Sequence, residues 1–98
     1  MVVVAGGSWV YAGEVVKAVD IVGLNYDFWY ELALADGRLE PGEAARPLGA
    51  DGLLYYVRFR HAGRPVEATW PDSAGHDTIE AAQRAAESRV TGPISWDR

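Results

Sequence analysis

The chain has no cysteine, and its 98 residues include one lysine, one methionine and two histidines. The absence of cysteine excludes disulfide bonds and thiolate metal sites, and it suits a reducing compartment. The first apolar run is not preceded by basic residues, as it would be in a signal peptide. It is also shorter than the roughly 20 residues of a membrane-spanning helix. We therefore expect a cytoplasmic protein with no membrane span, no cofactor and no bound metal.

Basic charge is also scarce. The formal net charge is −5 and the isoelectric point is about 4.8. Eight of the nine basic residues are arginine, which we attribute to the codon bias of a GC-rich bacterial genome. Because a surface of this charge repels polyanions on average, nucleic acid and anionic membranes are disfavoured as partners.

One cluster of arginines resembles an RNA-binding surface in composition. Arg58, Arg60 and Arg64 are interleaved with aromatic residues, and aromatic residues on a sheet can stack single-stranded bases. In a strand, however, Tyr55 and Phe59 point away from the face that carries Arg58 and Arg60. We therefore do not expect this segment to bind RNA.

Large side chains are plentiful for a chain of this length. Hydrophobic residues make up 49% of the sequence and include four tryptophans, five tyrosines and two phenylalanines. Each aromatic side chain can bury roughly 150–250 Å², so one core is feasible without a covalent link. We expect residues 1–98 to form a single domain.

Short alternating or β-branched runs predict most of the secondary structure. They predict strands at 14–22, 26–35, 53–61, 66–70 and 94–96, with a further strand or loose arm at the N-terminus. Residues 37–52 contain two prolines and four glycines and predict a long surface loop.

Residues 77–90 are the one segment that predicts a helix clearly. Its apolar positions Ile79, Ala82, Ala86 and Val90 follow helical spacing and form a stripe that is mostly alanine. Asp77 is the expected N-cap, with Glu80 three residues later as in a capping box.

This order of elements predicts an α+β fold: a mainly antiparallel sheet of four to five strands with one C-terminal helix packed on one face. We expect the first four strands to form a meander. One short helix covers a single face, so the opposite face needs the long loop, the N-terminal arm or another chain to cover it. We predict that this face binds a protein partner, or a second copy of the chain, through an interaction surface made of Trp29, Glu31, Tyr56, Arg58 and Arg60.

The protein's function is not specified by any catalytic motif, and we expect a small non-enzymatic interaction module. An alternative is an enzyme or small-ligand binder with an aromatic pocket between the sheet and the 37–52 loop. Its expected lining is aromatic, with one histidine as the polar group: Trp9, Tyr26, Tyr30, Trp70 and His61.

A second alternative comes from a local resemblance. The run from Gly75 to Ala82, followed by Ala85-Ala86-Glu87, resembles the turn-and-helix segment of HicB-like antitoxins. Those proteins neutralise a toxin by direct contact, so the resemblance implies an antitoxin-like regulator. The strands upstream do not match the compact hairpin of that family.

Overall fold

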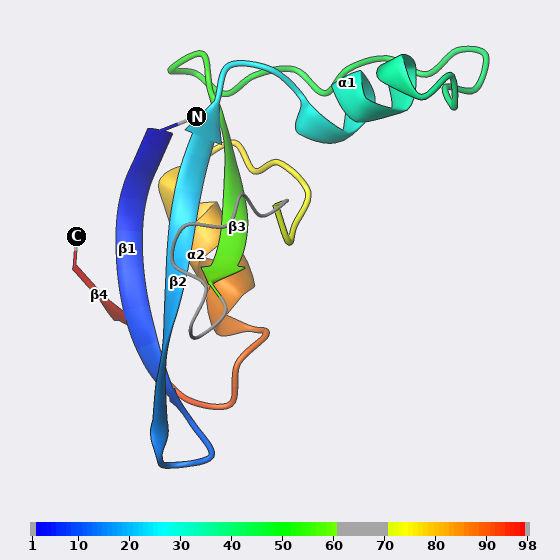
Figure 1. Ribbon diagram of the computed structural model, residues 1–98. Coiled ribbons are helices and arrows are strands. Elements are labelled where there is room, and N and C mark those ends of the chain that lie inside the picture. The colour runs from blue at the N-terminus through cyan, green and yellow to red at the C-terminus, as the bar shows by residue number, and fades with distance from the viewer. Residues whose placement is uncertain (1, 61–70, 98) are drawn as a thin grey trace.

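Figure 1 shows the chain in a computed structural model that describes residues 2–60 and 71–97. Within these residues the fold has four strands and two helices: β1 (Val2–Tyr11), β2 (Val15–Leu24), α1 (Phe28–Ala35), β3 (Leu54–Arg60), α2 (Ile79–Glu87) and β4 (Ser95–Trp96). The strands pair antiparallel in the order β3-β2-β1-β4. The predicted α+β class, with an antiparallel sheet and a C-terminal helix, is confirmed.

The longest element of the sheet is the hairpin of β1 and β2, whose tip extends beyond the other strands (Figure 1). Ala12 and Gly13 form its turn with positive φ angles of 54° and 73°. Gly7 lies inside β1, where a Cβ atom would come within 2.8 Å of Ile94 and Trp96. Gly7 therefore does not end the strand; it lets the C-terminal segment approach the strand closely.

The main core lies between the sheet and α2. Ala82 and Ala86 are fully buried and pack against buried side chains of β2 and β3, which are Val19, Ile21, Tyr55 and Val57. The alanine stripe of α2 therefore faces bulkier strand residues, as its sequence predicts.

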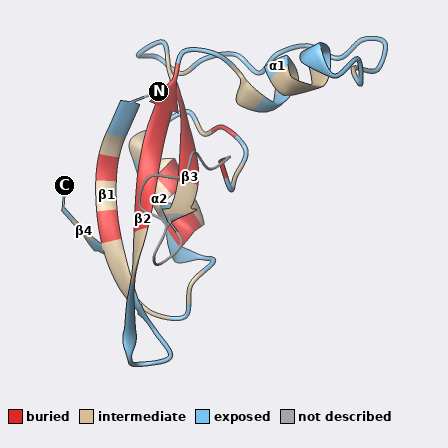
Figure 2. Ribbon diagram, in the orientation of Figure 1, coloured by how far each residue is buried: buried red, intermediate tan, exposed pale blue. Residues whose placement is uncertain are grey.

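The opposite face of β2 and β3 is buried as well. Val22 and Tyr56 have no exposed surface, and Phe28 packs against them. Asp20 on the same face is 4% exposed. Figure 2 shows the second half of β2 and the adjoining first half of β3 in the colour of buried residues. The interaction surface predicted on this face requires it to be exposed, and around Val22 and Tyr56 it is buried within the single chain.

The predicted strand at 26–35 is also wrong, because residues 28–35 form α1. The carboxylate of Asp27 caps the helix by accepting a hydrogen bond from the Tyr30 N–H at 3.2 Å. At the other end Gly37 has a φ of 68°, and the Arg38 N–H donates to the Ala33 carbonyl at 2.8 Å. The positive φ of Gly37 and the bond from Arg38 to Ala33 are those of a Schellman motif. Both ends of the helix therefore have their own capping residues.

The absence of a strand at 26–35 changes the sheet order. β2 pairs directly with β3, from Leu24 opposite Leu54 to Ala18 opposite Arg60, so the predicted meander of the first four strands does not form. The predicted strand at 66–70 lies outside the described residues. Within the described ranges, neither helix has the length and apolar character that crossing a membrane requires.

Candidate functional site

Helix α1 is an apolar helix that projects from one end of the sheet (Figure 1). All of its residues except Glu31 are apolar or aromatic, yet none of them is buried. Trp29 is 39% exposed and Leu34 is 54% exposed; on either side of the helix Tyr26 and Leu48 are each 41% exposed. We call the segment from Tyr26 to Leu48 the α1 arm.

The first turn of α1 is held by hydrogen bonds of three side chains, two of which join it to the body of the protein. The Phe28 N–H donates to the Tyr56 hydroxyl at 2.8 Å, and the Trp29 indole N–H donates to the Ser73 carbonyl at 2.8 Å. The carboxylate of Asp27 accepts from the Arg46 N–H at 2.9 Å. The last turn has no such attachment, since Leu34 and Ala35 are exposed. The helix is therefore held at its start and presented to solvent at its end.

The α1 arm is more acidic than basic. Its carboxylates are Asp27, Glu31, Asp36, Glu40 and Glu43, and its basic residues are Arg38 and Arg46. The exposed apolar side chains are therefore surrounded by net negative charge, which favours a positively charged partner surface.

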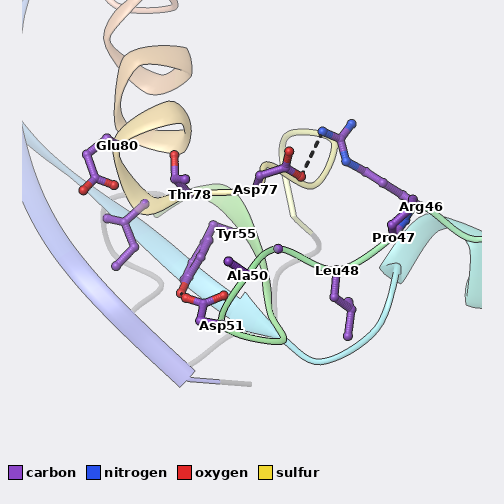
Figure 3. A pocket seen from close by; sticks show the side chains of 11 residues that line it. Arg46, Pro47, Leu48, Ala50, Asp51, Tyr55, Asp77, Thr78 and Glu80 are labelled. Atoms are coloured by element: carbon purple, nitrogen blue, oxygen red, sulfur yellow. Dashed lines mark hydrogen bonds and ion pairs between the residues drawn. The ribbon is translucent and has the colours of Figure 1, made fainter.

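An open groove of about 880 Å³ lies where the arm returns to the body. One wall is the loop at 46–51 and the other is the first turn of α2 at 77–80, with Tyr55 of β3 between them (Figure 3). The groove carries three carboxylates, those of Asp51, Asp77 and Glu80.

The charges of the groove shift the pKa of one of its own side chains. The Tyr55 hydroxyl donates a short hydrogen bond to the Asp51 carboxylate. This bond, burial of the ring and the negative charges of Asp51 and Glu80 together raise the pKa of Tyr55 to about 12. Tyr55 therefore keeps its proton near neutral pH and can donate this bond.

Arg46 connects the α1 arm with α2. Its side chain pairs with Asp77 across 3.3 Å, and both side chains are largely exposed (Figure 3). Close by, a Cβ atom on Gly49 would lie 2.4 Å from the Asp77 carbonyl oxygen. The loop therefore touches the start of α2 backbone to backbone. Burial, and next the charge of Arg46, lower the pKa of the neighbouring His76.

The N-cap of α2 differs from the sequence prediction by one residue. The Thr78 side chain, and not that of Asp77, accepts the hydrogen bond from the Ala81 N–H at 3.1 Å. This shift frees the Asp77 carboxylate from capping and leaves it at the groove.

The five predicted surface residues do not share one face. Trp29 and Glu31 are both exposed on α1. Tyr56 is fully buried and bonded to the start of α1. Arg58 pairs with buried Asp20 at 3.1 Å, and its side chain is only 18% exposed. Arg60 ends β3, and its side chain lies outside what the structure describes.

The residues predicted to line an aromatic pocket do not line the groove either. Trp9 belongs to β1, and Tyr26 and Tyr30 lie at the start of the α1 arm. His61 and Trp70 lie outside the described residues. The groove lies between residues 46–51 and the first turn of α2, and its walls are mainly acidic and aliphatic. Across residues 2–60 and 71–97, no three His, Cys, Asp or Glu side chains are grouped to hold a metal ion.

Comparison with known proteins gives partial matches. The chain is 34% identical over 70 residues to a protein named ribosome maturation factor RimM from two strains of Xanthomonas campestris pv. campestris. The aligned part is 70% of this chain and 41% of the relative, so the chain spans less than half the length of the curated relatives it matches. No family model and no solved structure matches the chain. The antitoxin-like alternative stays a prediction, since no comparison bears on it.

Proposed function

We propose that the protein is a non-enzymatic protein-binding module and that the α1 arm is the surface it presents to its partner. The observation that carries this proposal is an apolar helix without one buried residue. A helix of this length is marginally stable on its own, because few hydrogen bonds repay its nucleation. Phe28 already packs on the core, and burial of Trp29 and Leu34 against a partner would add further apolar contact to α1.

We further propose that this partner is a protein of the maturing ribosome. The similarity to a ribosome maturation factor supports a role in ribosome maturation, and the acidic charge of the arm supports a basic protein as the partner. An acidic surface repels the phosphates of RNA and attracts a basic protein. A role on the maturing ribosome supports a location in the cytoplasm.

Cosedimentation with ribosomal particles tests the proposal. The purified protein is mixed with ribosomal subunits and precursor particles from its own source, and the bound fraction is measured after centrifugation. We expect the wild type to bind, and Leu34→Glu to bind at least about tenfold more weakly, because exposed apolar residues at an interface centre carry much of the binding energy.

Val16→Glu is the matched control. Val16 is 67% exposed at the hairpin tip, away from the arm, so it receives the same change at a different place. It should bind as the wild type does. Equal binding by Leu34→Glu would exclude the α1 arm as the contact. Absence of wild-type binding to every particle would exclude the ribosomal partner.

A further inference from the structure

The groove beside the α1 arm combines negative charge with apolar walls. Pro47, Leu48 and Ile79 contribute the apolar lining. The lining holds three carboxylates and one guanidinium, that of Arg46, which pairs with Asp77, so the groove keeps a net negative charge. It adjoins the arm directly, because Leu48 belongs to both surfaces.

We infer that this groove binds an arginine side chain of the protein partner. The inference rests on the proposed function in one respect, namely that the partner is a protein. It adds the chemistry of recognition: apolar contact along the arm and one cationic side chain in the groove. The chain alone supplies both surfaces.

A cation is favoured over an anion even though the groove includes a helix N-terminus. The start of α2 contributes about half a positive charge from its unpaired N–H groups. Asp77 and Glu80 each contribute a full negative charge at the same turn. The carboxylates therefore outweigh the helix dipole, and an anionic ligand would meet repulsion.

Arginine is favoured over lysine because of the shape of the site. The Arg46 guanidinium already lies against Asp77, so the wall of the groove accepts that group. A guanidinium can bond a carboxylate with two parallel N–H groups and is less strongly hydrated than an ammonium group. Its aliphatic stem would lie along Leu48 and Ile79, as arginine stems commonly do on apolar surfaces.

Titration of the labelled full chain by NMR tests this inference with a defined probe, N-acetyl-leucyl-arginine amide. We expect saturable shifts of the backbone amides at 46–51 and 77–80. The same dipeptide with citrulline keeps the shape and removes the charge, and it should bind at least about tenfold more weakly. The lysine dipeptide should fall between the two.

Two variants locate the contact. Glu80→Gln and Asp77→Asn should each weaken binding of the arginine dipeptide by about threefold, the scale of one exposed ion pair. Glu14→Gln changes the net charge equally but lies in the exposed β1–β2 turn, outside both the groove and the α1 arm, and should bind as the wild type does. The spectra of the free variants show whether each is folded.

Equal binding of arginine and citrulline, no saturable binding, or shifts centred elsewhere would overturn the inference. These outcomes are distinguishable from failure of the proposed function. If ribosomal particles bind in a manner sensitive to Leu34→Glu while the dipeptide does not bind, only the groove inference fails. If the dipeptide binds and the particles do not, the groove remains and the ribosomal partner is excluded.

Discussion

At the scale of single residues, the two described ion pairs, Asp20–Arg58 and Arg46–Asp77, differ in how far their side chains are buried. Asp20 and Arg58 lie opposite each other on β2 and β3, with side chains that are 6% and 18% exposed. Arg46 and Asp77 pair at a similar distance with side chains that are 48% and 64% exposed. Water screens the second pair, whereas the first is held in a medium of lower dielectric constant.

We therefore expect the two pairs to differ in what their loss does to stability. Asp20→Ala should lower the free energy of unfolding by about 3 kcal/mol, because it leaves a desolvated guanidinium without this carboxylate. Arg46→Ala should lower it by less than about 1 kcal/mol. Urea unfolding followed by tryptophan fluorescence measures both. Equal losses in the two variants would mean that burial does not govern the first pair.

At the scale of an element, α1 depends on the side chain of Asp27. This carboxylate caps the helix at the Tyr30 N–H and also holds the Arg46 N–H of the returning loop. Removal of an N-cap side chain costs about 1 kcal/mol, which is large for an eight-residue helix with no buried residue.

Asp27→Ala should consequently unwind α1 while the sheet stays intact. Amide hydrogen exchange at residues 28–35 should become faster, and the amides of β2 and β3 should keep their protection. Glu31→Ala provides the control, because it removes a charge from the first turn and keeps the cap. Protection of α1 that survives in Asp27→Ala would show that other contacts hold the helix.

The two helices differ in how far their sequences predict them. In α2 the apolar stripe and the flanking caps agree, and only the N-cap is displaced by one residue, from Asp77 to Thr78. In residues 26–35 the apolar positions fit both an alternating strand and a helix, so the period of the pattern alone does not decide between the two. The signals that do decide are Asp27 as a cap, the leucines and alanines as helix formers, and Gly37 after the last turn.

The site is less predictable than the fold, since it depends on how distant segments meet. The groove joins 46–51 to 77–80, which no spacing in the sequence connects. The exposure of Trp29 follows from α1 projecting, and the burial of Tyr56 follows from its bonds to the start of that helix. Alternation along a strand predicts which side chains share a face and does not predict whether that face is covered.

For the whole molecule, the outer edge of β1 is the feature that bears on association. In the described part of the chain, β4 pairs with β1 only at Gly7 and Ser8, so Val2–Ala5 have no strand partner on that side. Val2 and Val3 are more than half exposed, and the segment carries no charged side chain. An uncharged, β-branched open edge of this kind can pair with another copy.

Sedimentation velocity over a range of protein concentrations should therefore detect reversible self-association. Val3→Lys should weaken it, because a charge on an edge strand opposes pairing with a second strand. Val16→Lys should not, because Val16 pairs with Val10 of β1 near the hairpin tip, away from the edge at Val2–Ala5. A mass that stays at 10.7 kDa throughout would rule out pairing through this edge.

The contact of Gly49 with the Asp77 carbonyl has a mechanical consequence. Because no side chain separates the two backbones, a displacement of the loop must either move the start of α2 or break the contact. Replacing Gly49 with alanine would place a Cβ atom too close to the Asp77 carbonyl oxygen, so the loop and the start of α2 would have to separate.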